Sequence, residues 1–186
     1  MSAKWLSAAW ASILSLFGCG GFTDIIDHGV PNLQQVAPGM WRMGQPADAA
    51  AWQWLATQVG EKGKSVLVVK LNDDNEGDDR PASAIPGWMV MRLPIPPEDD
   101  KAWTVLVKPS REDVAKIYES ISQAHALGQV VVWHCTHGRD RTGLVTAVIR
   151  MKLFGWTKKK AWDEMIARGF RWELPDLDAY WIEDVR

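Results

Sequence analysis

The sequence lacks the residues that would tie a chain together covalently or hold a structural metal. Only two of its 186 residues are cysteines, and they lie in very different surroundings, which excludes a disulfide framework. His134, Cys135 and His137 cluster, with His125 upstream, but structural zinc sites normally use paired clips of two to four residues. The chain also lacks internal repeats, low-complexity tracts and interdomain linkers. These absences favour one globular unit stabilised by its own core.

An excess of positive charge is also missing. The formal net charge is −2, which disfavours a general nucleic-acid-binding protein, so an anionic ligand would need a local positive site. Tryptophan, by contrast, is abundant. We interpret most of the 12 tryptophans as core and groove-lining residues, and the alternative is a carbohydrate- or partner-binding surface.

The N-terminal segment has the pattern of an export signal. Lys4 precedes an apolar run over residues 5–17 that is too short to span a membrane comfortably, and small residues follow it. Residues 16–19 resemble the bacterial lipoprotein cleavage box, in which Cys19 would carry a lipid. We therefore expect residues 1–18 to be a signal peptide and the protein to lie in the cell envelope or periplasm. The alternative is a buried or amphipathic first helix of a cytoplasmic protein.

Strand and helix patterns alternate along the rest of the chain. Apolar, β-branched runs predict buried strands over 65–71, 88–93 and 130–133, with a short strand over 41–43 in an irregular entry segment, 32–46. Helical patterns cover 47–59, 110–127, 142–154, 157–168 and 176–185. The alternation predicts an α/β fold with a central, mainly parallel sheet flanked by helices. Residues 72–80 form a polar loop that fails the EF-hand pattern, and 94–109 form a long loop of the kind that is often functional.

One loop carries the chemistry. After the strand over 130–133 come His134 and Cys135, then five residues, then Arg141, Thr142, Gly143 and a helix. A loop between a buried strand and a helix N-terminus turns successive backbone N–H groups into a concavity that binds a phosphate dianion. The same field stabilises a thiolate, the form of cysteine that acts as a nucleophile. A buried core cysteine is the alternative for Cys135, but it does not explain the rest of the pattern.

The neighbours of Cys135 suggest further roles. Arg141 can hold two phosphate oxygens with its planar fork, Thr142 can donate its hydroxyl to the sulfur, and His134 can order the loop. Asp140 could hold the hydrolytic water or form a salt bridge with Arg139. The residues that we expect to bind phosphate or substrate are Thr136, His137, Gly138, Arg139, Asp140 and Lys70.

These residues resemble a known family. The His-Cys-x5-Arg-Thr-Gly segment is similar to the signature of the cysteine-dependent protein tyrosine phosphatase superfamily, and residues 32–46 resemble the entry segment of small dual-specificity-like phosphatases. The resemblance covers residues 30–186 and implies a single phosphatase domain with a dual-specificity-phosphatase-like fold and a strand–P-loop–helix active site. It is strongest to the branch of inositol phosphate phosphatases that includes the protein-tyrosine-phosphatase-like phytases.

The resemblance also implies a general acid, because a phosphomonoester leaves as an alkoxide unless it is protonated. In the superfamily this group is an Asp on a loop upstream of the nucleophile. Asp100, three residues before Trp103, is the leading candidate, and Asp99 is the alternative. The sequence lacks the Trp-Pro-Asp triplet of tyrosine-specific members. Both carboxylates could instead be solvated loop charges.

Three functions remain in competition. The first is a phosphomonoesterase that forms a cysteinyl-phosphate intermediate on inositol polyphosphates such as phytate. The second is a phosphotyrosine or dual-specificity protein phosphatase; the motif also resembles RNA 5′-triphosphatases, but the acidic charge argues against them. The third is a phosphate-binding pseudophosphatase or scaffold, which intact Cys135 and Arg141 disfavour. The chemistry needs no metal and no organic cofactor, and the partner we expect is a small phosphate ester rather than a nucleic acid.

Overall fold

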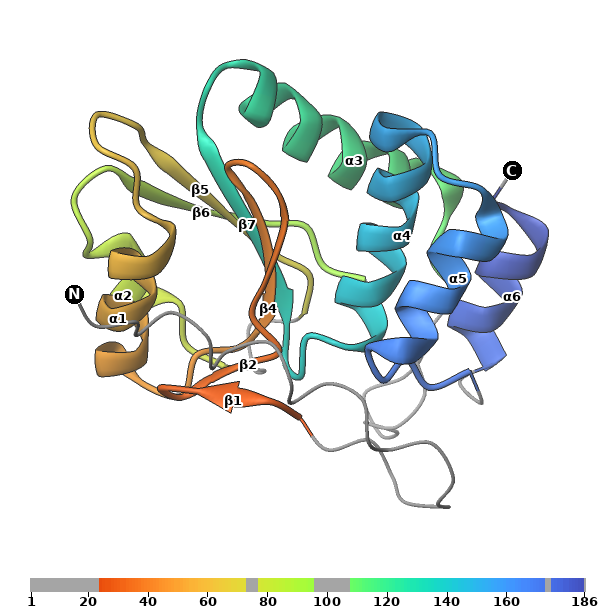
Figure 1. The fold of residues 1–186 in the computed structure, drawn as a ribbon, viewed down its shortest axis with the longest axis horizontal. Coiled ribbons are helices and arrows are strands. Elements are labelled where there is room, and N and C mark those ends of the chain that lie inside the picture. Colours follow the sequence, from red (N-terminus) through yellow and green to blue (C-terminus); the bar gives the residue numbers. More distant parts are fainter. Residues whose placement is uncertain (1–23, 73–76, 96–107, 173–174, 186) are drawn as a thin grey trace, which may run out of the picture.

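The chain folds around a five-stranded sheet. The computed structural model describes residues 24–72, 77–95, 108–172 and 175–185. The strands of the sheet are β3 (Gln34–Ala37), β4 (Met40–Gly44), β5 (Val66–Lys70), β6 (Trp88–Arg92) and β7 (Val130–Cys135). Their order is β3-β4-β7-β5-β6, in which only β3 is antiparallel to its neighbour (Figure 1). The predicted α/β fold with a mainly parallel central sheet is confirmed.

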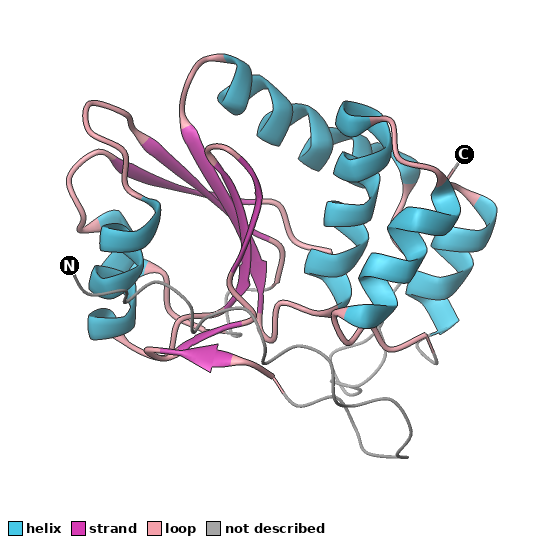
Figure 2. Ribbon diagram, viewed as in Figure 1, coloured by secondary structure: helices cyan, strands magenta, loops and turns pink. Residues whose placement is uncertain are grey.

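Helices cover both faces of the sheet. They are α1 (Ala49–Val59), α2 (Arg80–Ser83), α3 (Arg111–Ala126), α4 (Asp140–Phe154), α5 (Lys158–Ala167) and α6 (Pro175–Glu183). α1 and α2 lie on one side, α3 and α4 on the other, and α5 and α6 pack on α4 (Figure 2). A small hairpin of β1 (Ile26–Asp27) and β2 (Val30–Pro31) precedes the sheet. No helix in the described segments is both long and apolar enough to cross a bilayer.

The central strands are buried on both faces because helices cover both. In β5, Val66 and Val68 pack in the apolar cluster beneath α1, while Leu67 and Val69 pack in the cluster that faces α3 and α4. Every residue of β5 and β7 is buried. This explains the continuous apolar runs in the sequence, since a strand with one solvated face would alternate.

Several boundaries differ from the expectation. β7 runs on to Cys135, and α4 begins at Asp140 rather than 142, because an acidic residue is favourable in the first turn of a helix. The entry segment holds a hairpin, β3–β4, and the polar loop ends in the one-turn helix α2. α3 begins with a capping box formed by Ser110 and Asp113.

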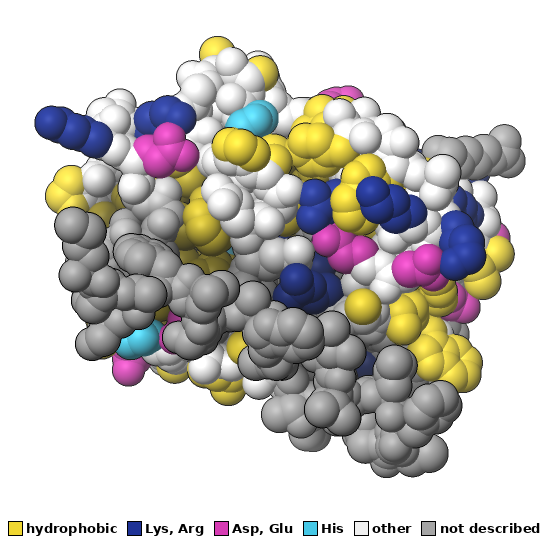
Figure 3. All heavy atoms as spheres, in the orientation of Figure 1, with side chains coloured by type: hydrophobic (Ala, Val, Ile, Leu, Met, Phe, Trp, Pro, Cys, Tyr) yellow, Lys and Arg dark blue, Asp and Glu magenta, His cyan; other side chains and the backbone are white. Residues whose placement is uncertain are grey.

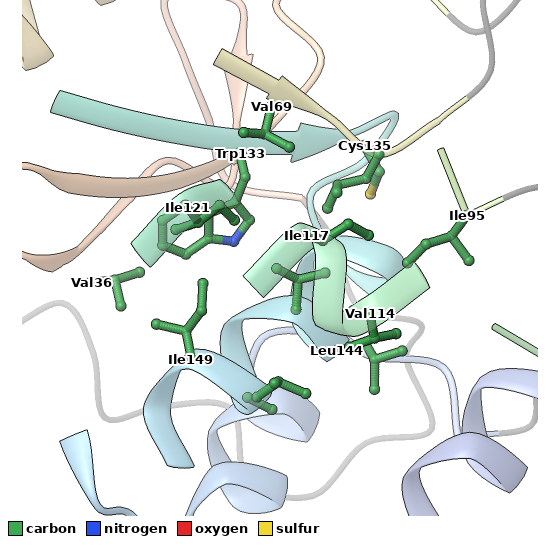
Figure 4. Packing of buried hydrophobic residues seen from close by; sticks show 14 of the residues in the cluster. Val36, Val69, Ile95, Val114, Ile117, Ile121, Trp133, Cys135, Leu144 and Ile149 are labelled. Carbon is green, nitrogen blue, oxygen red and sulfur yellow. The ribbon is translucent and has the colours of Figure 1, made fainter. Parts of the chain in front are cut away.

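Hydrogen bonds inside the core connect β7 to α4. Trp133 extends from β7 among Ile121 and Ile149, as Figure 4 shows. Its indole Nε1 donates to Thr146 Oγ1 at 3.0 Å, and that hydroxyl donates to the carbonyl of Thr142 at 2.6 Å. All three residues are buried, so these bonds hold the first turns of α4 at a fixed distance from the strand that carries Cys135.

We predict that Thr146→Val destabilises the protein by about 1–3 kcal/mol, because the Trp133 N–H is left buried without an acceptor. Urea denaturation followed by tryptophan fluorescence measures the loss. Ser120→Ala is the control, since the Ser120 hydroxyl also donates to a helical carbonyl but in an exposed hydrogen bond, and we expect it to change stability by less than about 0.5 kcal/mol. Equal effects of the two changes would contradict the role of Thr146.

Candidate active site

The sheet places the predicted nucleophile at the edge where three strands end. Cys135 is the last residue of β7, opposite Gly44 at the end of β4, and its neighbour His134 lies opposite Lys70 at the end of β5. The carboxyl ends of parallel strands form the usual ligand-binding edge of an α/β sheet. Residues 136–139 then lead from β7 into α4.

The loop and the first turn of α4 bring the signature residues together. The Thr142 hydroxyl donates to Cys135 Sγ at 3.1 Å, and both residues are buried. Arg141 lies in the same turn of α4 and is only 5% exposed. A thiol next to a hydroxyl donor and a helix N-terminus lies in the field that stabilises a thiolate.

The loop packs directly against the end of β4. A Cβ atom on Gly138 would lie 2.4 Å from Gly44 N and 2.5 Å from the Met43 carbonyl carbon, and the φ of Gly138 is 72°. A Cβ on Gly44 would in turn lie 2.8 Å from His137 C. Positions 44 and 138 therefore both require glycine, because no side chain fits between the loop and the strand.

Three donors outside the loop hold its carbonyl groups. The bonds run from Gln45 N to Thr136 O at 2.9 Å, from Asn32 Nδ2 to His137 O at 2.8 Å, and from the Arg42 guanidinium to Gly138 O. Arg42 is fully buried, and desolvation lowers its pKa to about 10, so it stays charged at neutral pH. The loop geometry is thus imposed by β4 and by the turn before β3.

A buried polar network lies beneath the loop. Lys70 Nζ is 3.3 Å from Asp79 Oδ2 and donates to the Gly77 carbonyl at 2.8 Å, while His134 Nε2 is 3.6 Å from Asp79 Oδ1. Burial lowers the pKa of His134 to about 4, although Asp79 acts in the opposite direction. His134 is therefore neutral at pH 7.

The prediction that Lys70 contacts the substrate is wrong in this structure. Its side chain is 0% exposed and its ammonium group is paired with Asp79 inside the protein. A lysine at the end of a buried strand needs such a carboxylate, since an unpaired buried charge is costly.

The rim of the loop combines exposed and paired groups. His137 is exposed, and the Thr136 hydroxyl accepts from Asn72 Nδ2 at 3.3 Å. Arg139 Nε lies 3.3 Å from Asp24. On the face of the molecule that Figure 3 draws, basic and acidic side chains lie next to one another.

Asp140 is paired with Arg171, which donates to its carboxylate from N, Nε and Nη2 at 2.8–3.0 Å. The expected alternative of a salt bridge between Asp140 and Arg139 is therefore wrong, since Arg139 is directed to Asp24. Asp140 is 5% exposed, and its bonds tie the start of α4 to the segment after α5.

Some predicted residues cannot be placed. Asp99, Asp100 and Cys19 lie outside the described residues, as does the expected signal peptide, 1–18, so their roles stay predictions. Among the residues that the structure describes, no group of three or more His, Cys, Asp or Glu side chains could hold a metal.

Sequence reasoning missed five supporting residues: Asn32, Arg42, Gln45, Asn72 and Asp79. One signal was available, because an arginine inside an apolar strand is almost never buried without a partner. Arg42 therefore indicated that a polar group must pack against β4.

We predict that Gly138→Ala costs about 1–3 kcal/mol more stability than Gly87→Ala, by comparison of their unfolding free energies in urea. Both glycines have positive φ, 72° and 81°, so both changes strain the backbone. A Cβ on Gly87 meets nothing within 4 Å, whereas one on Gly138 meets β4. Equal losses would show that loop and strand do not pack as described.

The buried His134 predicts a pH dependence of stability. Its folded pKa of about 4 lies below the unfolded value near 6.5, so the unfolded state takes up the proton first as the pH falls. The contribution of neutral His134 to stability is fully present above pH 6.5. As the pH falls from 6.5 to 4, the free energy of unfolding decreases by about 3 kcal/mol. We expect His134→Gln to lack this part of the acid destabilisation in urea titrations. The same pH profile in both proteins would contradict the assignment.

Comparisons with known proteins point to one superfamily. The family model described as the tyrosine phosphatase family matches residues 98–164, which include Cys135 and Arg141. The dual specificity protein phosphatase TpbA of Pseudomonas aeruginosa is 35% identical over 97 residues, 45% of this chain and 44% of that protein. The chain thus matches less than half the length of this curated relative.

Solved structures extend the likeness to most of the chain. The crystal structure of P. aeruginosa TpbA has a TM-score of 0.59 and 27% identity, covering 85% of this chain and 87% of that one. The catalytic core of the Saccharomyces cerevisiae PP-IP phosphatase SIW14 has a TM-score of 0.60 at 16% identity, covering 82% and 84%, and supports the fold alone. In the segment that carries Cys135 and Arg141, and in its fold, the chain is thus similar to proteins of the tyrosine phosphatase family.

Proposed function

We propose that this protein hydrolyses phosphate monoesters through a cysteinyl-phosphate intermediate on Cys135. The observation that carries the proposal is the buried Cys135 sulfur at the start of the loop, with the Thr142 hydroxyl 3.1 Å away and Arg141 in the same helical turn. The similarity to the tyrosine phosphatase family model and to TpbA supports it. TpbA is a dual specificity protein phosphatase by name, but this chain matches only 44% of it, so the activity is inferred.

The reaction has two steps. The Cys135 thiolate attacks phosphorus, the bond to the ester oxygen breaks, and that oxygen leaves with a proton from a general acid, for which Asp100 and Asp99 are the candidates. Water then attacks phosphorus and gives a proton to the same carboxylate, which is now the base. The S–P bond breaks, and the products are the Cys135 thiolate, inorganic phosphate and the regenerated acid. The Thr142 hydroxyl stabilises the departing sulfur, and Arg141 and the backbone N–H groups stabilise the equatorial oxygens.

The leading substrate class is an inositol polyphosphate such as phytate. Arg139 and Arg171 put positive charge at the loop rim, each next to a carboxylate, and exposed His137 could meet a further phosphate. SIW14, which shares the fold, is described as a PP-IP phosphatase.

A phosphotyrosine or dual-specificity protein substrate is the second candidate. A TpbA structure, 25% identical to this chain, is described as a complex with pTyr, and it covers 87% of this chain. In either case the partner is a phosphate ester rather than a nucleic acid, and the catalytic residues proposed here require neither a metal nor an organic cofactor.

We also propose that residues 1–18 direct export and that a lipid on Cys19 attaches the protein to a membrane of the cell envelope. The support is the sequence pattern alone, since this segment lies outside the described residues. The mass of the protein isolated from its native cell distinguishes the lipidated form from the intact chain of a cytoplasmic protein.

We predict that the wild type releases phosphate from an aryl phosphate and that Cys135→Ser lowers this rate by at least about a thousandfold. Phosphate release from phytate and from a phosphotyrosine peptide ranks the two substrate classes by kcat/KM. Ser120→Ala is the control, since it removes an exposed hydrogen bond within α3 and no residue of the loop, and we expect the wild-type rate from it.

Near-wild-type turnover by Cys135→Ser would overturn the mechanism. Hydrolysis of phosphopeptides without hydrolysis of phytate would replace the first substrate class by the second. Failure of the wild type on every ester would favour a phosphate-binding pseudophosphatase.

A further inference from the structure

Three successive peptide groups of the active-site loop are oriented from outside. A trans peptide is planar, so the carbonyl of one residue and the N–H of the next point in opposite directions, and the described chain contains no cis peptide. The carbonyls of residues 136–138 are held toward β4 and the turn before β3. The N–H groups of residues 137–139 therefore face the opposite side of the loop, where a phosphate at the N-terminus of α4 would bind.

Asn32 differs from the other two donors. Arg42 lies within β4 and Gln45 directly follows that strand, so the sheet fixes the positions of both residues. Asn32 lies between the short strands β2 and β3 and reaches His137 O with its side-chain amide, across 105 residues of sequence. This bond therefore depends on the backbone and side-chain conformation of Asn32 rather than on the position of a strand.

The surroundings of Asn32 fix that conformation. The residue is 5% exposed and has φ of 50°, a left-handed value that asparagine tolerates better than most residues. Its Oδ1 accepts from Ile25 N at 3.1 Å, and its Nδ2 donates to Asp24 Oδ1 as well as to His137 O, both at 2.8 Å. Both N–H groups of the side-chain amide thus have an acceptor, which fixes the orientation of the amide.

We propose that Asn32 is a positioning residue of the active-site loop. By holding His137 O it keeps the next peptide turned so that the Gly138 N–H faces a bound phosphate. This inference rests on the proposed function, because it assigns the loop to phosphate. The competing explanation is that Asn32 only closes the turn between β2 and β3, in which case its amide has no effect on anion binding.

The test is the affinity of the full chain for tungstate, a tetrahedral dianion with the shape of phosphate, measured by isothermal titration calorimetry. Asn32→Asp keeps the size and the left-handed tolerance but cannot donate when ionised. We expect tungstate to bind about tenfold more weakly, the effect of one net hydrogen bond. The amide resonance of Gly138, which tungstate should shift in the wild type, should shift less in the variant.

Asp48→Ala is the matched control. It removes the side-chain cap of α1, a 2.8 Å bond to Ala51 N, and lowers stability without touching the loop. We expect it to bind tungstate as the wild type does. If loss of stability alone weakened binding, this control would weaken it too, and the positioning role would be overturned.

Asn32→Gly keeps the left-handed backbone and removes the amide, so it gives the answer if Asn32→Asp does not fold. Wild-type affinity in a folded Asn32 variant would overturn the inference, as would a wild type that does not bind tungstate. A wild type that binds tungstate and hydrolyses no ester would overturn the proposed function, while the comparison of affinities would still test Asn32.

Discussion

The proposed active site depends on hydrogen bonds that hold the loop carbonyls of residues 136–138 from outside. An anion-binding loop must present several N–H groups to one point, and a free loop would lose that arrangement because each peptide can rotate. Here Arg42, Asn32 and the backbone of Gln45 restrain three peptides in succession. The close packing of Gly138 on β4 adds a steric restraint to the same segment.

Burying the charged donor beneath the loop costs free energy. Arg42 is a charged side chain with 1% exposure, and its lowered pKa reflects the desolvation that this burial imposes. Lys70 and Asp79 add a buried ion pair beneath the loop, next to a neutral His134. Such polar groups in a core specify one arrangement of the surrounding elements only when they are paired. Here Arg42 links β4 to the active-site loop, while Lys70 and His134 link β5 and β7 to Asp79.

Local features were the ones that the sequence could predict. β5 and β7 are continuous apolar runs rich in β-branched residues, and the expected bond from the Thr142 hydroxyl to the Cys135 sulfur spans only one strand-to-helix loop. The strands β1 to β3 have two to four residues and carry too little periodicity to be recognised. The bonds of Asn32 and Arg42 to the loop cross 105 and 96 residues, and no local pattern encodes such contacts.

Lys70 was misjudged for a related reason. Its position at the end of a buried strand, next to the loop, was correct, but the sequence does not show that Asp79 returns to pair with it. The same holds for Asp140, whose partner Arg171 lies 31 residues away rather than next to it. The fold must therefore be known before the charged residues that contact a substrate can be distinguished from those that form structural ion pairs.

The central claim is that Cys135 carries the phosphoryl group during turnover. Rapid acid quenching during hydrolysis of an aryl phosphate, followed by mass spectrometry of the peptide that contains Cys135, tests it most directly. We expect a fraction of that peptide to carry one phosphoryl group on sulfur, and none before substrate is added. Turnover with no phosphoryl group on Cys135 at any quench time would show that water attacks the ester directly, and would contradict the claim.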